Sequence, residues 1–533
     1  MSSGYKICGR TSLALVGLFL CRAPSWAGDP WDEPFAKDTS GFQAAARATK
    51  SEPGDASVIL LQEGRYAYDA GHRQSSCNRY VVRLLTAEGA AGWGDVTASW
   101  TPSHNKRPVV RARVIAPDGT VTDLNPQSLI ERQLPAEDGV YGDRHVMEGP
   151  LPSLPIGALL ESEVCHGDSK PFFPAGVAGL WHVGSSERVL RWRFRFDAPT
   201  SLHARVEALG PQNTPLKHQV FQGRDEWRLE GGEIKWDLEG YVPPSQRQIP
   251  AFAYSTAQTW KAVAAAYSAS LPIDPLPPEL KKVAEDHVTR FPERRDRAEA
   301  LLAWVQAHVR YTGIQIGPHN LTPVSSATTI SRGFGDCKDQ SFLLAQLLEA
   351  SGIRARLALL DSGDWLDIPA DHPGMGLFDH AIVVAEGPDP LWMDPTDAHA
   401  PATVLRADLS GRLALIIDKG TSGLVTTPTS DPAQHGWTER REIWLSADGP
   451  SRWQEVTEYY GHADQKIKAG YRDRTPEETQ ETLTTYAKTA WGESEQLKIS
   501  VTDARSRTTP FQIGIFGVGT FLTAIEGLDS RSA

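Results

Sequence analysis

Three residues in the middle of the chain have the types that nucleophilic catalysis requires. Cys337, His380 and Asp394 follow one another in that order. A cysteine can act as a nucleophile, a histidine can take its proton, and a carboxylate can orient the histidine. Each residue alone would have an ordinary structural role, as a core thiol, a strand histidine or a turn acid. The set of three predicts a catalytic triad.

Cys337 falls in the first turn of a predicted helix. Asp336 has the side chain of a good N-cap, and Gly352 provides a stop at the other end. Between them, apolar residues recur at helical spacing, namely Phe342, Leu343, Leu344, Leu347 and Leu348. The unpaired amides and the positive end of a helix favour a thiolate over a thiol. The neighbouring Lys338 either adds to this effect or faces water.

Two predicted strands bring the other two residues together. His380 opens an apolar run that ends at Ala385, and the segment 387–390 is rich in glycine and proline, which indicates a turn. The next strand covers Leu391 to Met393, with Asp394 at its end. In an antiparallel hairpin the start of one strand lies near the end of the next. We therefore expect His380 and Asp394 to be neighbours.

The loop before His380, residues 361–377, has an unusual composition. It contains Gly374, Gly376 and four acids, which are Asp361, Asp364, Asp367 and Asp371. Glycines would allow such a loop to move as a lid, and acids would disfavour anionic substrates. A solvated connector fits the same composition. Both interpretations remain open at this level.

These motifs resemble the transglutaminase-like superfamily of papain-type cysteine enzymes, over a run from about Ser255 to Thr396. The matching segments are Gly335-Asp336-Cys337-Lys338-Asp339, Phe378-Asp379-His380-Ala381-Ile382 and Trp392-Met393-Asp394-Pro395-Thr396. The resemblance implies a papain-like α+β core in which a helix packs on an antiparallel sheet. It implies that Cys337 is the nucleophile, His380 the general base and acid, and Asp394 the group that orients the histidine.

A second resemblance precedes the core. The segments 114–121 and 154–157 are similar to a β-rich domain of unknown function that often precedes transglutaminase-like cores in bacterial exported proteins. The core superfamily includes amide-crosslinking enzymes, peptidases, deamidases and inactive members. The two resemblances together imply chemistry at an acyl or amide carbon, without specifying a substrate.

Gln315 is a candidate for stabilising the oxyanion of such a reaction. It lies in the segment 313–317, in the loop region before the cysteine motif. Its side-chain amide could donate to an oxyanion beside the backbone amide of Cys337. A structural role in the loop is equally consistent with the sequence.

Composition favours a soluble, multi-domain protein. The chain has 533 residues, of which 40% are hydrophobic and 23% charged, and its formal net charge is −12. A chain of this length suggests about three domains. The acidic balance argues against nucleic acid or an anionic membrane as the main partner. We expect no cofactor and no metal site, because no cluster of His, Cys or Asp has metal-ligand spacing.

The N-terminus resembles an export signal. Lys6 and Arg10 precede an apolar run at residues 13–20, and small residues precede a cleavage point before Gly28. The alternatives are an uncleaved anchor and a lipid-modified Cys21. The prediction is a periplasmic or secreted protein.

The predicted compartment bears on the cysteines. Cleavage before Gly28 would leave Cys77, Cys165 and Cys337 from the five cysteines of the chain. In an oxidising compartment two of them are expected to pair, and Cys77 and Cys165 share the β-rich region. Cys337 would then be the remaining thiol. Three free cysteines are the alternative.

A strict alternation of apolar and arginine residues occupies the segment 190–196. The arginine row fits either a site for a polyanion or a solvated sheet face, and nearby acids favour the solvated face.

The fold class is α+β, with an antiparallel β-rich domain before the core and a smaller mixed region after it. A hairpin is expected around residues 442–456, and a capped helix is expected from Thr475. The predicted organisation is a signal peptide at 1–27, a lead-in at 28–55, a β-rich domain at 56–250, a transglutaminase-like core at 251–425, and a mixed β region at 431–533 that is small or incomplete.

Hydrolysis of a peptide or protein amide, as by a peptidase, amidase or deamidase, is the favoured function, because water is abundant and nothing specifies an amine pocket. The alternatives are an amide-crosslinking acyl transferase and a non-catalytic protein that binds or assembles with a cell-envelope partner. The sequence makes no prediction of the oligomeric state.

We predict that protein recovered from an exporting host begins near Gly28 and contains one disulfide, Cys77–Cys165. The h-region and the count of three remaining cysteines are the reasons. Intact mass spectrometry before and after alkylation, with and without reduction, measures both features. Retention of Met1, or alkylation of three thiols without reduction, would contradict the prediction.

Overall fold

The structure is a computed structural model, and it divides into two compact units, residues 1–50 and 51–533. It describes residues 31–519 apart from 135–139, 211–214, 237, 240–241, 243–247, 316–320, 364–366, 399–400, 403–404, 447–448 and 507–508. The predicted signal peptide at 1–27 lies outside the described residues. In the part of the chain that is described, no helix is long and apolar enough to cross a membrane.

The first unit contains one described helix, α1 (Ser40–Ala48). The ring of Trp31 meets the ring of Phe42 on this helix edge to face, with 4.7 Å between centroids. The lead-in is therefore partly helical, whereas the polar composition of residues 28–55 predicted a loose segment.

The β-rich domain is built around a large, mostly antiparallel sheet. Its strand order is β14-β15-β12-β1-β2-β9-β4-β5, with β11 also paired to β1. The strands are β1 (Ser57–Tyr68), β2 (Gln74–Leu84), β4 (Val109–Ile115), β5 (Val121–Asp123), β9 (Leu159–Gly167), β11 (Arg188–Val189), β12 (Trp192–Pro199), β14 (Lys217–Phe221) and β15 (Arg224–Gly231).

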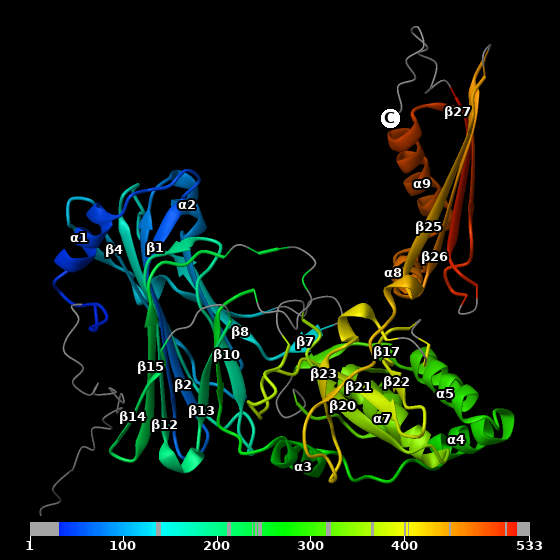
Figure 1. Ribbon diagram of the computed structural model, residues 1–533, viewed down its shortest axis with the longest axis horizontal. Coiled ribbons are helices and arrows are strands. Elements are labelled where there is room, and N and C mark those ends of the chain that lie inside the picture. The colour runs from blue at the N-terminus through cyan, green and yellow to red at the C-terminus, as the bar shows by residue number, and fades with distance from the viewer. Residues whose placement is uncertain are drawn as a thin grey trace, which may run out of the picture. The chain divides into compact units, whose positions relative to one another are not determined.

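Two three-stranded sheets and a short helix complete this domain (Figure 1). One sheet has the order β10-β16-β13, from β10 (Ala178–His182), β13 (Arg205–Leu209) and β16 (Ala251–Ser255). The other has the order β3-β8-β6, from β3 (Asp95–Trp100), β6 (Ile130–Gln133) and β8 (His145–Pro150). The helix is α2 (Ala87–Gly92).

An aromatic layer joins the large sheet to the sheet of β10, β13 and β16. Phe194 of β12 stacks on Trp181 of β10 and on Phe252 of β16, at 5.1 Å and 5.6 Å between ring centroids. Offset aromatic pairs of this kind stabilise a core beyond the area that they bury. The apolar half of the alternating segment 190–196 therefore forms the domain core.

The arginine half of that segment is not a solvated face. Arg193 is fully buried, and its Nε lies 2.6 Å from a carboxylate oxygen of Glu63 on β1. Arg79 on β2 is also fully buried and lies between Glu63 and Glu161, and Arg113 on β4 donates to Glu161 at 2.7 Å. The alternation correctly predicted that the arginines share one face of the sheet. The prediction that this face is exposed was wrong, because neighbouring strands supply acids that pair with the arginines and long side chains cover these pairs.

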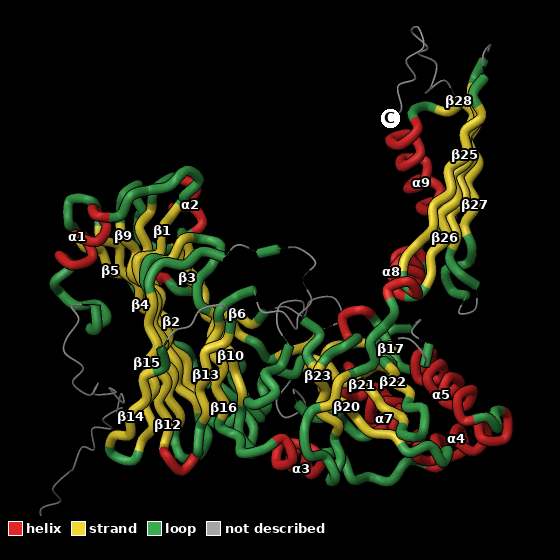
Figure 2. The backbone as a smooth tube through the Cα atoms, viewed as in Figure 1, coloured by secondary structure: helices red, strands yellow, loops and turns green. Residues whose placement is uncertain are grey.

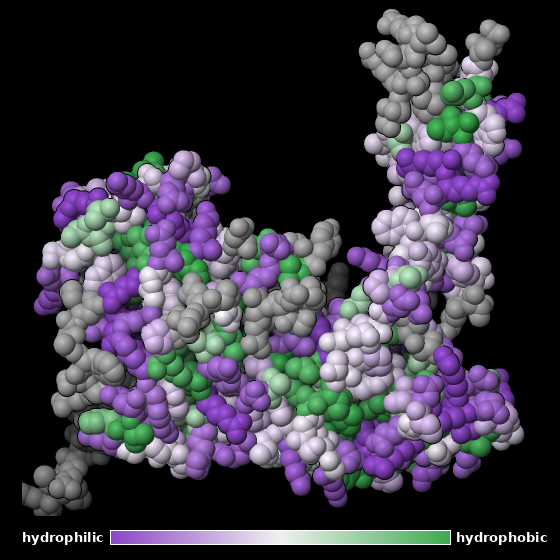
Figure 3. Space-filling model, in the orientation of Figure 1, coloured by the Kyte–Doolittle hydropathy of each residue, from purple (hydrophilic) through white to green (hydrophobic). Residues whose placement is uncertain are grey.

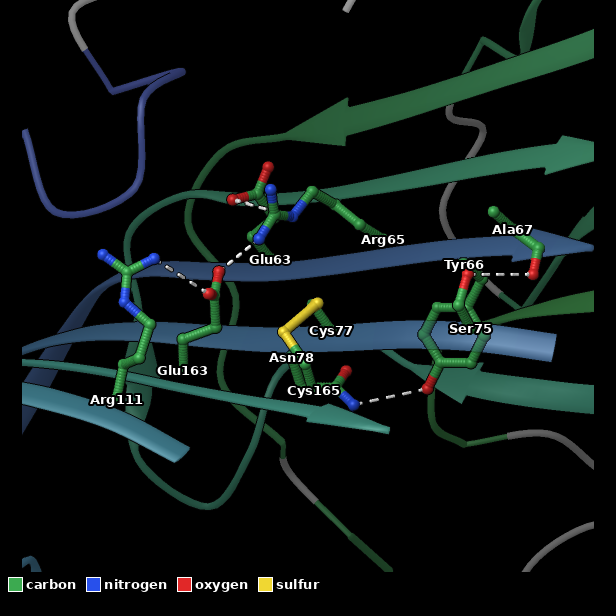
Figure 4. Close-up of a disulfide and its surroundings, with 10 residues drawn as sticks. All are labelled: Glu63, Arg65, Tyr66, Ala67, Ser75, Cys77, Asn78, Arg111, Glu163 and Cys165. Carbon is green, nitrogen blue, oxygen red and sulfur yellow. Dashed lines mark hydrogen bonds and ion pairs between the residues drawn. A yellow bond between two sulfur atoms is a disulfide. The ribbon is translucent and has the colours of Figure 1, made fainter. Parts of the chain in front are cut away.

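A disulfide crosses the middle of the same sheet. Cys77 on β2 and Cys165 on β9 are directly opposite one another in the antiparallel pair, and the structure joins them. Figure 4 shows Glu163, two residues before Cys165, held between Arg65 and Arg111. Among the described residues, Cys77, Glu163 and Cys165 form the group whose spacing resembles a metal site, but both sulfurs are already bonded to one another.

The core domain has a five-stranded sheet with helices packed on it. The sheet order is β22-β21-β20-β23-β24, from β20 (Ala355–Leu360), β21 (His380–Ala385), β22 (Leu391–Met393), β23 (Leu413–Ile416) and β24 (Val425–Thr426). The helices are α3 (Trp260–Ser270), α4 (Pro278–Arg290), α5 (Arg294–His308), α6 (Ser326–Arg332) and α7 (Cys337–Ala350). Helix α7 lies against β20 and β21, and α4, α5 and α6 contact α7 (Figure 1).

Short strand pairs lead into α7. The pair β17 (Arg310–Tyr311) and β19 (Phe334–Gly335) is parallel, and β19 ends two residues before Cys337. A second parallel pair joins β18 (Gly313–Gln315) to β7 (Val140–Gly142) of the β-rich domain.

The loop before His380 is docked on the β-rich domain. The backbone N–H of Ala178 donates to the carbonyl of Met375 at 2.7 Å, and Met375 N–H donates to Gly176 at 3.2 Å. Ser255 donates to the carbonyl of Pro373, and Arg205 donates to that of Asp371. These bonds do not favour a lid that hinges at Gly374 and Gly376, because the two glycines lie within the docked stretch.

The C-terminal region is a four-stranded antiparallel sheet with two helices along it (Figure 2). The order is β25-β26-β28-β27, from β25 (Gly436–Trp444), β26 (Ser451–Tyr460), β27 (Ser494–Val501) and β28 (Gln512–Gly519), and the helices are α8 (His462–Tyr471) and α9 (Pro476–Trp491). The predicted hairpin is β25–β26, and Thr475 forms the predicted capping box with Glu478. Residues 520–533 lie outside the described part.

Charged and polar side chains cover much of the face seen in Figure 3, with apolar groups scattered between them. The predicted α+β class, with a β-rich region before a mixed core, is confirmed.

We predict that Gly374→Ala destabilises the protein by about 2 kcal/mol or more. An added Cβ would lie 2.2 Å from the backbone nitrogen of Ala178, so the docked loop would have to move. Denaturant unfolding measures the loss. The control is Gly423→Ala, where nothing lies within 4 Å of an added Cβ. Equal stability of the two variants would show that the docking contact is dispensable.

Candidate active site

Cys337 is the first residue of α7. Asp336 is the N-cap, and its carboxylate accepts the backbone N–H of Asp339 at 3.2 Å. The thiol of Cys337 is free and partly buried. The helix therefore points its unpaired amides and positive end at the sulfur, as the sequence predicted.

His380 is the first residue of β21, and Asp394 directly follows β22. These two strands pair antiparallel, with Val383 opposite Met393. The Nε2 of His380 lies 3.0 Å from Oδ2 of Asp394. The hairpin therefore produces the predicted contact.

A hydrogen bond between helix and sheet holds the cysteine side of the site to the histidine side. Ser341 lies one turn after Cys337 on α7 and is fully buried. Its hydroxyl donates to the backbone carbonyl of Ala381 at 2.9 Å, and Ala381 is the residue after His380. This bond fixes the position of α7 along β21.

The electrostatic environment favours a charged His380. Burial alone would lower the pKa of His380, but the charge of Asp394 and their hydrogen bond raise it, together with a hydrogen bond to Cys337 and the charge of its thiolate. The net effect raises the pKa of His380 to about 10. Because Nε2 bonds to Asp394, Nδ1 is the ring nitrogen left for Cys337. The three predicted residues are thus brought together in the predicted order of roles.

Asp394 is buried with both oxygens bonded. Burial would raise the pKa of Asp394, but the charge of His380 and their hydrogen bond, with help from Arg406 and Thr396, lower it to about 2. Thr396 donates to Oδ1 through its hydroxyl at 2.7 Å and through its backbone N–H at 3.0 Å. The guanidinium of Arg406 lies 3.8 Å from Oδ2.

Sequence reasoning missed three of these supporting residues. Thr396 lies two positions after Asp394, which is the spacing of a local Asx-type turn and could have been recognised. Ser341 sits one turn after the cysteine, but its partner is set by the packing of α7. Arg406 comes from a loop twelve positions after Asp394, and no pattern in the chain predicts its contact.

Lys338 does not face water, which was one of the two roles considered for it. Its side chain is buried and forms an ion pair with Asp336. Asp339 is buried as well, and its carboxylate accepts the backbone N–H of Val324 at 2.9 Å. Burial and the charge of Asp336 raise the pKa of Asp339. The charged residues around Cys337 thus anchor the start of α7.

Two tyrosines lie close enough to the thiol to sense its charge. Burial, followed by the charges of Cys337 and Asp336, raises the pKa of Tyr311 to about 12. The same causes raise the pKa of Tyr267, whose hydroxyl donates to the carbonyl of Leu321 at 2.8 Å. Tyr311 is half exposed, so it offers a phenol at the edge of the site.

The oxyanion candidate Gln315 is only partly described. Its backbone ends β18 and pairs with Gly142. Its side chain lies outside the described residues, so the choice between an oxyanion donor and a loop residue stays open.

Comparison with known families bears on both domains. Residues 281–405 match the model of the transglutaminase-like superfamily, and residues 70–235 match a domain of unknown function with known structure, DUF3857. The chain has a transglutaminase-like core. Both predicted resemblances are confirmed, and the three candidate residues all fall within the matched core.

A solved structure shares the fold at low sequence identity. A proposed protease from Parabacteroides distasonis aligns with a TM-score of 0.59 and 11% identity, covering 87% of this chain and 93% of that one. A proposed cysteine protease from Cytophaga hutchinsonii aligns with a TM-score of 0.19 and 16% identity, covering 47% of this chain and 76% of that one. The first likeness shows a shared fold. No curated protein matches the chain.

The transglutaminase-like core thus carries a thiol, an imidazole and a carboxylate in contact, which is the arrangement of a cysteine-hydrolase-like site. Such a set can move a proton from sulfur to imidazole and stabilise the resulting charges.

We predict that Asp394→Asn lowers stability most between about pH 4 and 6.5. The raised pKa of His380 gives stability that is full below about 6.5 and is lost as pH rises toward 10. The lowered pKa of Asp394 gives stability that is full above about 3.8 and is lost as pH falls toward 2. Breaking a buried pair costs on the order of 3 kcal/mol.

Denaturant unfolding across pH 3 to 10 measures this difference. The control is Asp371→Asn, which removes an exposed acid of the docked loop. A difference between wild type and Asp394→Asn that does not vary with pH would contradict the charged pair.

Proposed function

We propose that this protein is an exported cysteine enzyme that hydrolyses an amide bond of a peptide or protein. The observation that carries the proposal is the contact of Cys337 with His380 and of His380 with Asp394, at the N-terminus of a buried helix. Hydrolysis is proposed because water is always present as an acceptor for the acyl group.

The first half of the reaction forms an acyl-enzyme. His380 takes the Cys337 proton, and the thiolate attacks the amide carbonyl carbon. The carbon–sulfur bond forms as the carbonyl electrons move to oxygen. Backbone N–H groups at the start of α7 favour that negative charge. Collapse of the tetrahedral intermediate breaks the carbon–nitrogen bond, and His380 gives its proton to the leaving amine.

The second half releases the acyl group. His380 takes a proton from water, and the hydroxide attacks the thioester carbon. The carbon–sulfur bond breaks, a carboxylic acid leaves, and the proton on His380 returns to sulfur. Asp394 keeps the imidazole oriented and compensates its positive charge in both halves.

Two features support export. The basic and apolar segments at residues 6–20 have the pattern of a signal peptide. The Cys77–Cys165 disulfide fits an oxidising compartment, because cytosolic thiols are kept reduced. A periplasmic or secreted location would place the enzyme among envelope peptides and proteins, which are the proposed partners.

A non-catalytic scaffold would not need the buried contacts around Asp394. Thr396 donates to Oδ1, and Arg406 lies near Oδ2, the oxygen that also bonds to His380. Such support is expected where a carboxylate must hold an imidazole in one orientation. We therefore propose an active enzyme.

We predict that Cys337 reacts with iodoacetamide at pH 6 at least ten-fold faster than a free cysteine in a short peptide, as helix-terminal thiolates paired with histidine do. His380→Ala should remove most of this excess. Mass spectrometry of the labelled chain over time gives the rate. Protein unfolded in urea is the control, and its Cys337 should react like the peptide.

Equal rates for the folded protein and the free peptide would contradict an activated thiolate. The labelling rate of Cys337 in Asp394→Asn should fall below the wild-type rate.

Turnover depends on the same thiol. Cys337→Ala should abolish release of product from any peptide amide that the wild type cleaves.

A further inference from the structure

A cavity of about 950 Å³ lies between the β-rich domain and the core. Its β-rich wall comes from the ends of β1, β2, β9 and β10 and from the loops beside them. Its core wall comes from Leu321 before α6, from the loop that follows β20 and from the segment just before β21. The cavity is large enough for a peptide side chain with part of its backbone.

The core wall of this cavity adjoins the triad. Leu377, Phe378 and Asp379 line the cavity and directly precede His380 in the chain. Leu321 lines it as well, and its carbonyl accepts the hydroxyl of Tyr267, whose pKa responds to the charge of Cys337. A ligand in the cavity would therefore contact the segment that leads into His380.

The cavity carries an excess of negative charge. Its lining includes three aspartates, which are Asp168, Asp361 and Asp379. The lining also includes Lys170, whose side chain is exposed to solvent. Burial lowers the pKa of His166 and of His182, which also line the cavity, whereas His104 lies 3.7 Å from Asp168. Carboxylates at a desolvated wall favour a cationic ligand over a neutral or anionic one.

Asp361 has capacity for a further partner. One of its oxygens accepts the N–H of Gly363 at 3.2 Å. Burial, and after it the charge of Asp379, raises the pKa of Asp361 to about 6. The charge of Arg412 acts on the carboxylate and favours a lower pKa, but no lysine or arginine among the described residues forms an ion pair with it. Asp379 is held in place by Ser362, which donates to it through its N–H at 2.7 Å and its hydroxyl at 3.1 Å.

Part of the remaining wall is apolar. Phe172, Leu180, Leu377 and Phe378 line the cavity, and the ring of Phe378 meets that of Trp260 edge to face at 5.9 Å. Apolar walls that end at carboxylates match a side chain with an aliphatic stem and a cationic head. Lysine and diamino acids have that form.

We propose that this cavity binds a lysine-like side chain of the acyl-donor substrate, with its aliphatic stem against the apolar wall and its ammonium group at Asp361. That the bound peptide is a substrate rests on the proposed function. Binding of the lysine-like side chain does not, because it needs no turnover. The β-rich domain is then part of the substrate site, because it supplies Asp168, Phe172 and Leu180 to the cavity.

Binding to the Cys337→Ala protein tests this proposal without turnover. The probes are two acetylated and amidated pentapeptides that differ only at the central residue, which is lysine in one and norleucine in the other. Norleucine keeps the aliphatic stem and lacks the ammonium group. Isothermal calorimetry at pH 7.5 and low salt gives both affinities.

We expect the lysine peptide to bind at least about five-fold more tightly than the norleucine peptide, as for a partly exposed ion pair. Asp361→Asn, in the Cys337→Ala background, should reduce this preference to less than two-fold. Asp371→Asn is the matched control, because it removes an exposed acid of the same loop that does not line the cavity.

Equal binding of the two peptides, absence of binding, or a preference that survives Asp361→Asn would each overturn the proposal. A preference that Asp371→Asn also removes would overturn it too, because it would then reflect net charge alone. None of these outcomes tests the proposed function. That proposal is tested separately by the labelling rate of Cys337.

Discussion

The site depends on one packing constraint, which is the fixed position of α7 along β21. The thiol belongs to a helix and the imidazole to a strand 43 positions later, so nothing local keeps them in contact. The buried face of α7 packs on β20 and β21, and Ser341 adds a directional bond to Ala381. A shift of α7 by one residue would displace sulfur by about 1.5 Å along the helix axis, which is enough to lose a hydrogen bond. Dense packing prevents such a shift.

The β-rich domain contributes to the same constraint from the other side. Its strand β10 forms backbone hydrogen bonds with the loop that leads into His380. These bonds hold the segment before β21 against the β-rich domain. Gly374 permits the close approach of the two backbones. Because the loop is bonded to β10, the two matched families behave as one structural unit around the histidine. A domain without triad residues thus helps to position the loop that leads into the histidine.

Sequence patterns predicted the local parts of the site and missed the long-range ones. The N-cap Asp336, the helix that starts at Cys337 and the hairpin of His380 and Asp394 follow from spacing and turn residues alone. The contacts of Arg406 and Ser341 do not, because each depends on where a separate element packs. The burial of Arg193 and Lys338 was missed for a related reason. A charged residue in an alternating pattern usually faces water, and only the neighbouring strand or turn reveals an acid that can pair with it.

The buried charges of the large sheet also restrict how its strands can align. Glu63 faces Arg193 across the β1–β12 pair, while Phe194, next to Arg193, lies in the aromatic layer on the opposite face. Because side chains alternate between faces, sliding β12 by one residue would put guanidinium groups among Trp181 and Phe252 and leave Glu63 without its partner. Misaligned pairings would therefore be strongly disfavoured during folding. The ion pairs can thus select a single register for the sheet even where their net contribution to stability is small.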